Sequence, residues 1–311
     1  MGMTISKNTL RNWLTKGKTY LDEQVCVLKS ISLEKDSIVN CDETWCKVRK
    51  YDHYKKCYMW VLVNKAERLV IFFYEDGSRG RDVLTNFLGD AELKALMSDG
   101  YNAYVFIGDE LKTHRYKDTD HQVCLAHVRA KFVKARMEGG DKRADVFLGN
   151  INRLFRFERE YDREMITDGE RTRRRQGLPT MEAMINLRAN LLQELKSEEE
   201  QKSCYMREAL NYLHKFWNEA FTYIKDGRYP ISNNLAERAV RPFTTKRKNS
   251  LHFGSDEGAE IAAVYHSIIS TVKLQGRSAW DYLGKFFTGI FNGCRDFLSL
   301  TPQNMNLAVC Q

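Results

Sequence analysis

Residues 37–45 read SIVNCDETW, and two further apolar runs, CYMWVLVN at 57–64 and RLVIFFYE at 68–75, follow within a few residues. β-branched and aromatic residues dominate each run, and polar residues separate one run from the next, which is typical of successive strands. The separations are short enough for antiparallel hairpin connections. This stretch therefore predicts a sheet that begins with three sequential strands.

The next part of the chain predicts helices packed on that sheet. SRGRDVLTNFLGD at 78–90 places its apolar residues on one helical face. LKALMSDGYNAY at 93–104 is an apolar run ending in Asp-Gly, and HQVCLAHVRAKFVKA at 121–135 is another short run that enters a helix. The predicted order is β-β-β-α-β-α-β-α, a mixed sheet flanked by helices in the α/β class.

Residues 132–226 are predicted to form an all-helical insertion, because their composition becomes helical and highly charged. Within it, leucines recur at helical spacing, which indicates the core of a helix bundle more than a coiled-coil partner site. They are Leu187, Leu191, Leu192 and Leu195. Strong helical patterns return in NLAERAVRPF at 234–243, GAEIAAVYHSIISTVKLQG at 258–276 and SAWDYLGKFFTGIF at 278–291.

The composition favours a protein of the cytoplasm with a polyanionic partner. With 43% hydrophobic and 29% charged residues, no stretch approaches the roughly 18 apolar residues of a membrane span, and no export signal is visible. The formal net charge is +8, and a run of cations follows Glu237 before the next acid, Asp256. Clustered cations next to a candidate site suit phosphate groups. The cations are Arg238, Arg241, Lys246, Arg247 and Lys248.

The eight cysteines are scattered and are interpreted as reduced thiols. Cys124 and His127 form a CxxH, but no second pair completes the four ligands of a structural zinc. Packing in the core is the better interpretation of this pair.

Two aspartates are predicted to meet at one edge of the sheet. Asp42 and Asp99 each come at the end of an apolar run, and strand ends are where α/β sheets place ligands. Either residue alone would more often be a turn residue or a helix cap. A third carboxylate strengthens the functional interpretation.

Glu237 supplies that third carboxylate. Asn233, Asn234, Glu237 and Arg241 share one entirely polar helical face. Asn234 followed by Glu237 also has the spacing of a capping box, which needs no catalysis, and both interpretations can hold together. Carboxylates with open positions suit Mg²⁺, and two such ions can serve an in-line displacement at phosphorus without a protein nucleophile.

The chain resembles the transposases of the insertion sequence 66 family. The resemblance rests on CDETW around Asp42, SDGYNAY around Asp99, CLAHVRAKF after it and, above all, the stretch from Asp226 to Gly276. It covers roughly residues 37 to 283. It implies a ribonuclease-H-like core of the DDE type, interrupted by the helical insertion before the last acidic residue.

The resemblance implies that Asp42, Asp99 and Glu237 form a triad that binds Mg²⁺ or Mn²⁺, as two ions, to cut transposon ends and join them to target DNA. Asn233 and Asn234 would support the triad, and the basic motif would contact DNA phosphates or steady the triad. A homo-oligomer on DNA, in the bacterial cytoplasm and nucleoid, is implied as well. The motif comprises Arg238, Arg241, Lys246, Arg247, Lys248 and Asn249.

The predicted organisation follows from this resemblance. Residues 1–36 would be the helical remnant of an amino-terminal DNA-binding region, 37–131 the first part of the core, and 132–226 the insertion. Residues 227–290 would be the second part of the core with the Glu237 helix, and 291–311 a tail. The helix expected within residues 4–20 either docks on the main body or belongs to a helix-turn-helix whose first part is missing.

Besides the amino-terminal region, of which only a remnant is expected, a second departure and two alternatives remain open. Ser232 stands where the family would have an aspartate before the paired asparagines, although serine can still cap a helix. The alternatives to a transposase are a DNA-binding or partner subunit without independent activity, and a ribonuclease-H-like nuclease. Phe243 and Phe253 could stack on unpaired bases, although such residues are more often core, and His252 could lie near the metal.

Overall fold

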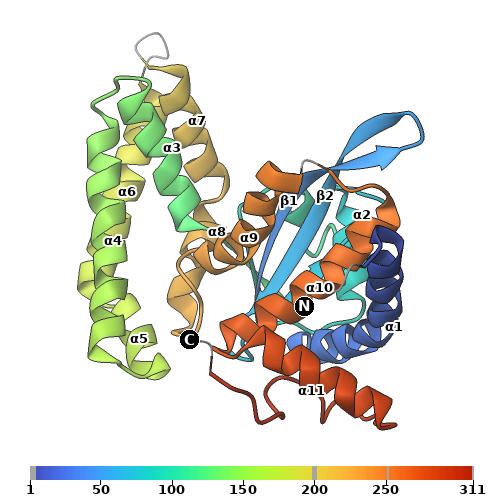
Figure 1. The fold of residues 1–311 in the computed structure, drawn as a ribbon. Helices are drawn as coiled ribbons and strands as arrows, with labels where there is room; N and C mark the ends of the chain where they lie inside the picture. The colour runs from blue at the N-terminus through green and yellow to red at the C-terminus, as the bar shows by residue number, and fades with distance from the viewer. Residues whose placement is uncertain (1–4, 198–201, 251, 310–311) are drawn as a thin grey trace. The chain divides into compact units, whose positions relative to one another are not determined.

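The computed structural model describes residues 5–197, 202–250 and 252–309, with only the backbone described for 246–250 (Figure 1). The chain divides into two compact units. Unit 1 comprises residues 1–94 and 235–311, and unit 2 comprises residues 95–234. Both units combine strands with helices, and five strands are described, of mixed direction, so the α/β prediction is confirmed.

Unit 1 is built on the three antiparallel strands predicted at the start of the chain. They are β1 (Ile38–Lys50), β2 (His53–Asn64) and β3 (Leu69–Phe73), with β2 in the middle. β1 and β2 are longer than predicted. Residues 46–49 of β1 alternate between buried and exposed positions despite their charges, and residues 53–56 of β2, which are all exposed, pair with residues 47–50. Asp42 therefore lies inside β1, and the prediction that it ends a strand is wrong.

The amino-terminal helix docks on the main body of unit 1, which was one of the two interpretations of its sequence. α1 (Lys7–Ser32) begins after Ser6, whose hydroxyl caps it by accepting a hydrogen bond from Thr9 N at 3.0 Å. Leu21 and Leu28 are fully buried in a cluster that includes side chains of α10 (Asp256–Leu274) and α11 (Ala279–Phe291). The second half of α1 therefore packs against helices of its own unit, whereas the apolar side chains of its first half are exposed, namely Leu10, Trp13 and Leu14.

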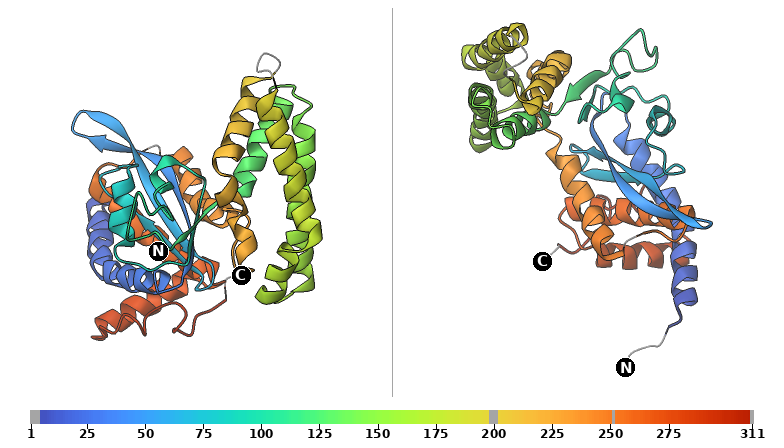
Figure 2. Two further views of the ribbon diagram at one scale, coloured as in Figure 1. Left: turned by 180° about the vertical axis from the view of Figure 1, so that it is seen from behind. Right: turned by 90° about the horizontal axis from the view of Figure 1, so that it is seen from above.

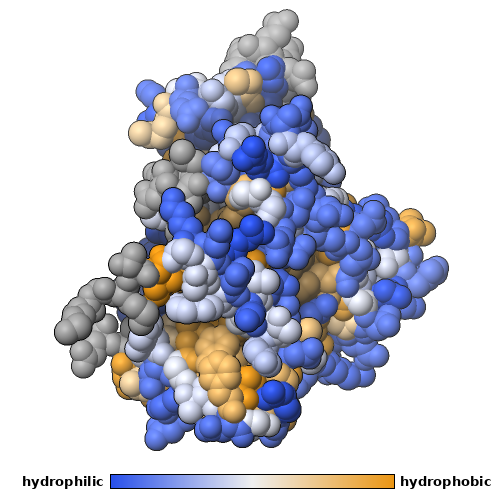
Figure 3. Space-filling model, turned by 45° about the vertical axis from the view of Figure 1, so that its right-hand side comes forward, coloured by the Kyte–Doolittle hydropathy of each residue, from blue (hydrophilic) through white to orange (hydrophobic). Residues whose placement is uncertain are grey.

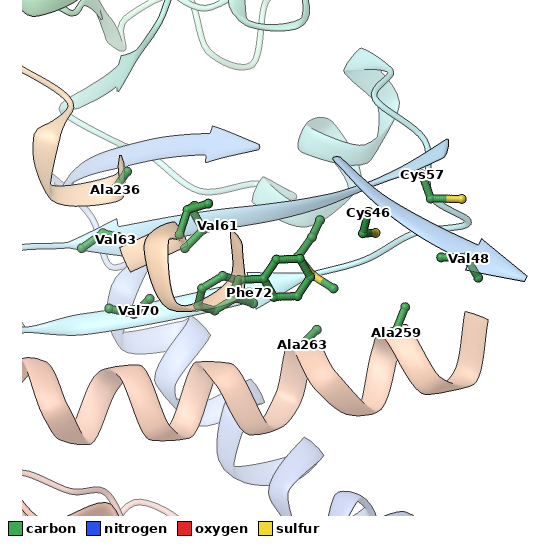
Figure 4. Close-up of a cluster of buried hydrophobic side chains, with 13 residues drawn as sticks. Cys46, Val48, Cys57, Val61, Val63, Val70, Phe72, Ala236, Ala259 and Ala263 are labelled. Carbon is green, nitrogen blue, oxygen red and sulfur yellow. The ribbon is translucent and has the colours of Figure 1, made fainter. Parts of the chain in front are cut away.

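One face of the three strands carries the core that positions α9 (Asn234–Ser250) and α10. Val61 and Val63 of β2 lie beside Ala236 of α9, and Phe72 of β3 lies over Ala263 of α10 (Figure 4). Directly paired residues on antiparallel strands point to the same face, so the cluster extends across all three strands. The small side chains of Ala236 and Ala263 let both helices approach the sheet closely.

Helix α10 also covers the outer edge of β3 with two hydroxyl groups. Thr271 Oγ1 accepts a hydrogen bond from Val70 N at 2.9 Å and donates one to Val70 O at 3.0 Å. Ser267 Oγ accepts one from Phe72 N at 2.8 Å. An open edge presents unpaired backbone groups that invite another strand. Here the polar residues of an otherwise apolar helix face satisfy them.

An apolar groove lies between the first half of α1 and α11 in unit 1. It measures about 1010 Å³ and includes Trp13, Trp280 and Phe291 in its lining, all of them exposed. Apolar residues also gather on the lower part of the face drawn in Figure 3. None of the helices in the described part of the chain is both long enough and apolar enough to cross a membrane.

Unit 2 begins with a parallel pair of strands, β4 (Ala95–Ser98) and β5 (Asp120–Val123). The helix predicted between them is wrong, because the described connection holds only the 3₁₀ turn Asn102–Tyr104. Gly100 and Gly108 interrupt this connection with φ of +78° and +73°, which a continuing helix does not allow.

The rest of unit 2 is helical. α3 and α4 pack together, as do α4 with α6, α6 with α7 and α3 with α7 (Figures 1 and 2). Leu187 and Leu191 are fully buried as predicted. Leu192 is exposed because it points away from their face of the helix, and Leu195 is exposed in the last turn of α6. The helices are α3 (Leu125–Met137), α4 (Ala144–Glu164), α5 (Asp168–Arg175), α6 (Leu178–Lys196), α7 (Cys204–Lys215) and α8 (Trp217–Phe221), followed by a 3₁₀ turn, Thr222–Lys225.

A buried arginine joins the insertion to the segment that leads into α9. The guanidinium of Arg175 forms a bidentate ion pair with Glu158, at 2.8 Å and 2.7 Å. It also donates hydrogen bonds to the main-chain carbonyls of Tyr223 at 2.7 Å, Asp226 at 2.6 Å and Tyr229 at 3.0 Å. Its donors are thus matched by fixed acceptors, which is the condition under which a buried charge is tolerated.

Candidate active site

Asp42 lies in the middle of β1 on the face that packs against α9. It is half-buried, and its Oδ1 accepts a hydrogen bond from the backbone N of Glu43 at 2.8 Å. Its cross-strand partner is Val61, whose side chain belongs to the cluster with Ala236. Because paired residues share a face, the carboxylate of Asp42 projects toward the side of the sheet that α9 covers.

Glu237 lies in the first turn of α9, directly after Ala236. Its side chain is half-buried, and the helix is anchored there by the contact of Ala236 with Val61 and Val63 (Figure 4). Asp42 and Glu237 therefore come from two elements of one unit that pack through their immediate neighbours. α9 begins at Asn234, which puts Glu237 in its fourth position, one residue beyond the capping-box position for an Asn233 cap.

Asp99 follows β4 directly, as predicted, and lies in unit 2. Its Oδ1 accepts a hydrogen bond from Tyr101 N at 2.8 Å, which orients the carboxylate. Gly100 adopts a φ of +78°, and a Cβ there would come within 3.0 Å of Tyr212 Oη and 3.1 Å of the Phe216 ring. The turn therefore requires glycine, both for its backbone conformation and for the close approach of α7.

Side chains of unit 2 that no sequence pattern pointed to support this turn. The hydroxyl of Tyr212 in α7 donates a hydrogen bond to the main-chain carbonyl of Asp99. Burial raises the pKa of Tyr212, and the negative charge of Asp99 raises it further, so the hydroxyl remains a donor. Tyr212 and Asp99 are 113 residues apart in the chain, and nothing local in either motif signals the contact.

A second support lies behind Asp99. Ser98 Oγ is 2.9 Å from Nε2 of the buried His121, and it accepts a hydrogen bond from Gly100 N at 3.2 Å. Burial lowers the pKa of His121 to about 4, so the imidazole is neutral at physiological pH. Cys124 N donates to Ser98 O at 2.9 Å, which joins the start of α3 to the end of β4.

A buried ion pair follows Asp42 on the opposite face of β1. Glu43 has a side chain only 1% exposed, and its Oε1 accepts hydrogen bonds from Arg79 Nε at 2.9 Å and Nη2 at 2.5 Å. The guanidinium of Arg79 also lies over the ring of Tyr58, 5.0 Å from its centroid. The two consecutive acids of β1 thus lie on opposite faces of the strand. Glu43 faces this arginine, and Asp42 faces α9.

The residues of the predicted basic motif and those just before it differ in how exposed they are. Arg238 and Arg241 are exposed on α9, as phosphate contacts would need to be. Asn234 is exposed and Ser232 is half-buried, whereas Asn233 is fully buried and its N donates to Cys124 Sγ at 3.1 Å. The side chains of Lys246, Arg247, Lys248 and Asn249 lie outside the described residues.

Burial bears on several residues that the sequence patterns singled out. Cys124 is fully buried, whereas His127 is half-buried. Phe243 is only 3% exposed and packs in the cluster beneath α9, so its suggested stacking on bases is wrong. Phe253 is half-buried and packs against the same cluster. Aromatic side chains next to a basic motif are here part of the core that anchors it.

Comparison with known proteins gives a family and two relatives. The family described as "Transposase IS66 family" matches residues 1–261. "Uncharacterized protein y4jD" of Sinorhizobium fredii (strain NBRC 101917 / NGR234) is 26% identical over 310 residues, covering 94% of this chain and 57% of the relative. "Uncharacterized protein y4qI" of the same strain is 27% identical over 239 residues, covering 76% and 43%. The chain thus spans about half the length of these curated relatives.

Proposed function

Because the chain belongs to the IS66 family of transposases, we propose that it catalyses metal-dependent cleavage and strand transfer of DNA at the ends of an insertion sequence. The proposed catalytic and metal-binding residues are Asp42, Asp99 and Glu237, on a ribonuclease-H-like core. The proposal rests chiefly on the pairing of Asp42 with Val61, because Val61 packs against Ala236, the neighbour of Glu237.

The carboxylates suit Mg²⁺ or Mn²⁺ in their chemistry and in how they are held. Both ions prefer oxygen ligands, and Mg²⁺ keeps several waters when it binds. Asp42 and Asp99 each have one carboxylate oxygen fixed by a backbone N–H, and each side chain is half-buried. Two bound ions would supply an activated attacking oxygen and stabilise the leaving one. Backbone N–H groups thus hold two of the carboxylates in place. A reaction of this kind requires no covalent protein nucleophile.

The proposed partner is DNA, both the ends of the element and its target. Arg238 directly follows Glu237 and Arg241 lies one helical turn beyond it; both are exposed, so they can contact phosphates next to the triad. Lys246, Arg247, Lys248 and Asn249 continue this proposed contact, and Asn233 and Asn234 support the start of the helix. Joining two ends requires an assembly, so we propose a homo-oligomer on DNA, which a comparison of solution mass with and without end DNA tests.

The test is cleavage of labelled element ends by purified protein with Mg²⁺ or Mn²⁺. Asp42→Asn, Asp99→Asn and Glu237→Gln should each abolish nicking and joining while circular dichroism and melting temperature stay near wild type. The matched controls, Asp118→Asn and Glu260→Gln, remove exposed carboxylates and should retain activity. Activity retained in a triad variant would remove that residue from the proposal.

Two other outcomes separate the remaining functions. Binding of end DNA without nicking under either metal would identify a DNA-binding or partner subunit without activity of its own. Cutting of branched or hybrid substrates, with no preference for element ends, would identify a nuclease of the same fold. Nicking restricted to element ends supports the transposase.

A further inference from the structure

The β1–β2 hairpin extends past the helices of its own unit (Figures 1 and 2). The two strands continue to Lys50 and restart at His53, and the turn residue Tyr51 is fully exposed. Within residues 46–56 the only acid is Asp52, against five lysines and arginines. Cys46 and Val48 pack on the core side of this ribbon, so its charged residues are concentrated on the turn and the other face.

The pairing register arranges these residues by face. On the face opposite the α9 cluster, Trp45 pairs with Tyr58, Lys47 with Lys56 and Arg49 with Tyr54. Cations and aromatic rings therefore lie on one side of the ribbon. Near the base the face is buried, since Trp60 is 0% exposed, whereas Trp45 is 37% and Tyr54 50% exposed. The exposed part of this face is here called the hairpin face, defined by Trp45, Lys47, Arg49, Tyr54, Lys56 and Tyr58.

The hairpin face holds two like charges directly opposite each other. Lys47 and Lys56 are cross-strand partners, and both side chains are exposed. Like charges at such a pair destabilise the sheet. Among the described residues, no ion pair with a carboxylate is formed by Lys47, Arg49 or Lys56. A polyanion placed against this face would turn the repulsion into attraction.

The hairpin is also tied to the chain that follows the predicted basic motif. Phe253 N donates to Lys47 O at 2.8 Å, and Arg49 N donates to Phe253 O at 2.9 Å, so this segment pairs with the edge of β1. Beside it, the ring of His252 lies 4.4 Å from that of Tyr54, and His252 Nε2 is 3.2 Å from Tyr54 Oη. His252 comes three residues after Asn249, so the residues that contact the hairpin follow the basic motif closely in the chain.

We propose that the hairpin face is a second DNA-binding element, which lies against the phosphates of a duplex. A two-stranded ribbon is one of the elements that the major groove of B-DNA admits, and lysine and arginine supply most phosphate contacts. The tyrosines add hydroxyl donors and ring surface at the same face. This proposal rests on the proposed function for its partner, but it requires neither the metal nor the triad.

The test is the salt dependence of DNA binding by the full chain, without divalent metal. Fluorescence anisotropy would follow a mixed-sequence duplex of about 30 base pairs, long enough for several phosphate contacts. In Lys47→Gln/Lys56→Gln, the slope of log affinity against log salt should become shallower by about 1.8, from about 0.9 per phosphate contact. Between about 50 and 200 mM salt, the variant should therefore lose about twelvefold less affinity than the wild type.

Two controls separate this role from general charge and from stability. Lys142→Gln/Lys196→Gln removes the same charge from exposed positions of unit 2 and should leave the slope unchanged. The hairpin variant should melt at the wild-type temperature or above it, because the substitution removes a repulsive pair. An unchanged slope in the hairpin variant, or equal changes in both double variants, would overturn the proposal. Tighter binding of a single strand of equal length would overturn the assignment to a duplex.

The same measurements distinguish this proposal from the proposed function. If the wild type never nicks DNA but the hairpin variant shows the shallower slope, the proposed chemistry fails and the hairpin assignment stands. If nicking depends on the triad while the hairpin variant binds as the wild type does, the hairpin assignment alone fails.

Discussion

Thr271→Val tests the contact by which α10 covers the edge of β3. Valine has nearly the shape of threonine, so the substitution opens no cavity and removes only the hydroxyl. That hydroxyl is fully buried and forms hydrogen bonds with both Val70 N and Val70 O, at 2.9 Å and 3.0 Å. The substitution therefore leaves a buried donor and a buried acceptor unpaired.

The expected cost follows from those two groups. An unsatisfied buried backbone group costs about 1–3 kcal/mol, and a carbonyl tolerates the loss better than an N–H. We therefore expect Thr271→Val to lower the free energy of unfolding by about 2–3 kcal/mol. Urea denaturation followed by tryptophan fluorescence would measure it as a lower midpoint at an unchanged slope.

The control is Thr288→Val in α11. Thr288 is exposed, and its hydroxyl donates only to Gly284 O in its own helix, at 2.8 Å. This substitution should change stability by less than about 0.5 kcal/mol. Amide exchange adds a local measurement, since Val70 N should exchange faster in Thr271→Val. Equal stabilities of the two variants, with Val70 N still protected, would refute the assignment of the edge contact to this hydroxyl.

Two further predictions concern unit 2. Arg175→Met should lower the free energy of unfolding by about 3–5 kcal/mol, because Glu158 keeps a buried charge and three main-chain carbonyls lose their donor. Urea unfolding measures the loss. The control is Arg163→Met, which replaces an exposed arginine of α4. Because burial lowers the pKa of His121 to about 4 from 6.5, the unfolded chain binds more protons between these values, and stability falls as the pH drops through them. Between about pH 7.5 and about pH 5 we expect a loss of about 2 kcal/mol, and equal pH dependence in His121→Gln would contradict it.

The elements that were predicted correctly from the sequence are those whose buried residues recur at a regular spacing. The apolar runs at 57–64 and 68–75 predicted β2 and β3, and the helical spacing after Asp256 predicted α10, because their buried residues alternate or recur regularly. The extension of β1 and β2 through residues 46–56 was missed, since charged side chains occupy most of it. The position of Asp42 inside β1 was misjudged for the same reason.

The acidic residues of the candidate site could be predicted from the sequence, but the residues that support them could not. Asp99 could be placed at the end of a strand because an apolar run and a glycine flank it. Tyr212, which holds its carbonyl, and Arg175, which fixes the approach to α9, act across the fold and have no signature in the local sequence. The alternative for Glu237 as a capping residue could be weighed only once the first residue of α9 was known.

The contact of Tyr212 with Asp99 bears on how this kind of protein can change over evolutionary time. An insertion that only decorates a core can be shortened, exchanged or lost without touching the chemistry. Here a helix of the insertion supplies the hydroxyl and, with Phe216, the packed surface against the turn that carries one of the proposed ligands. Shortening or replacing α7 would therefore take a hydroxyl donor and packed side chains away from the turn at Gly100.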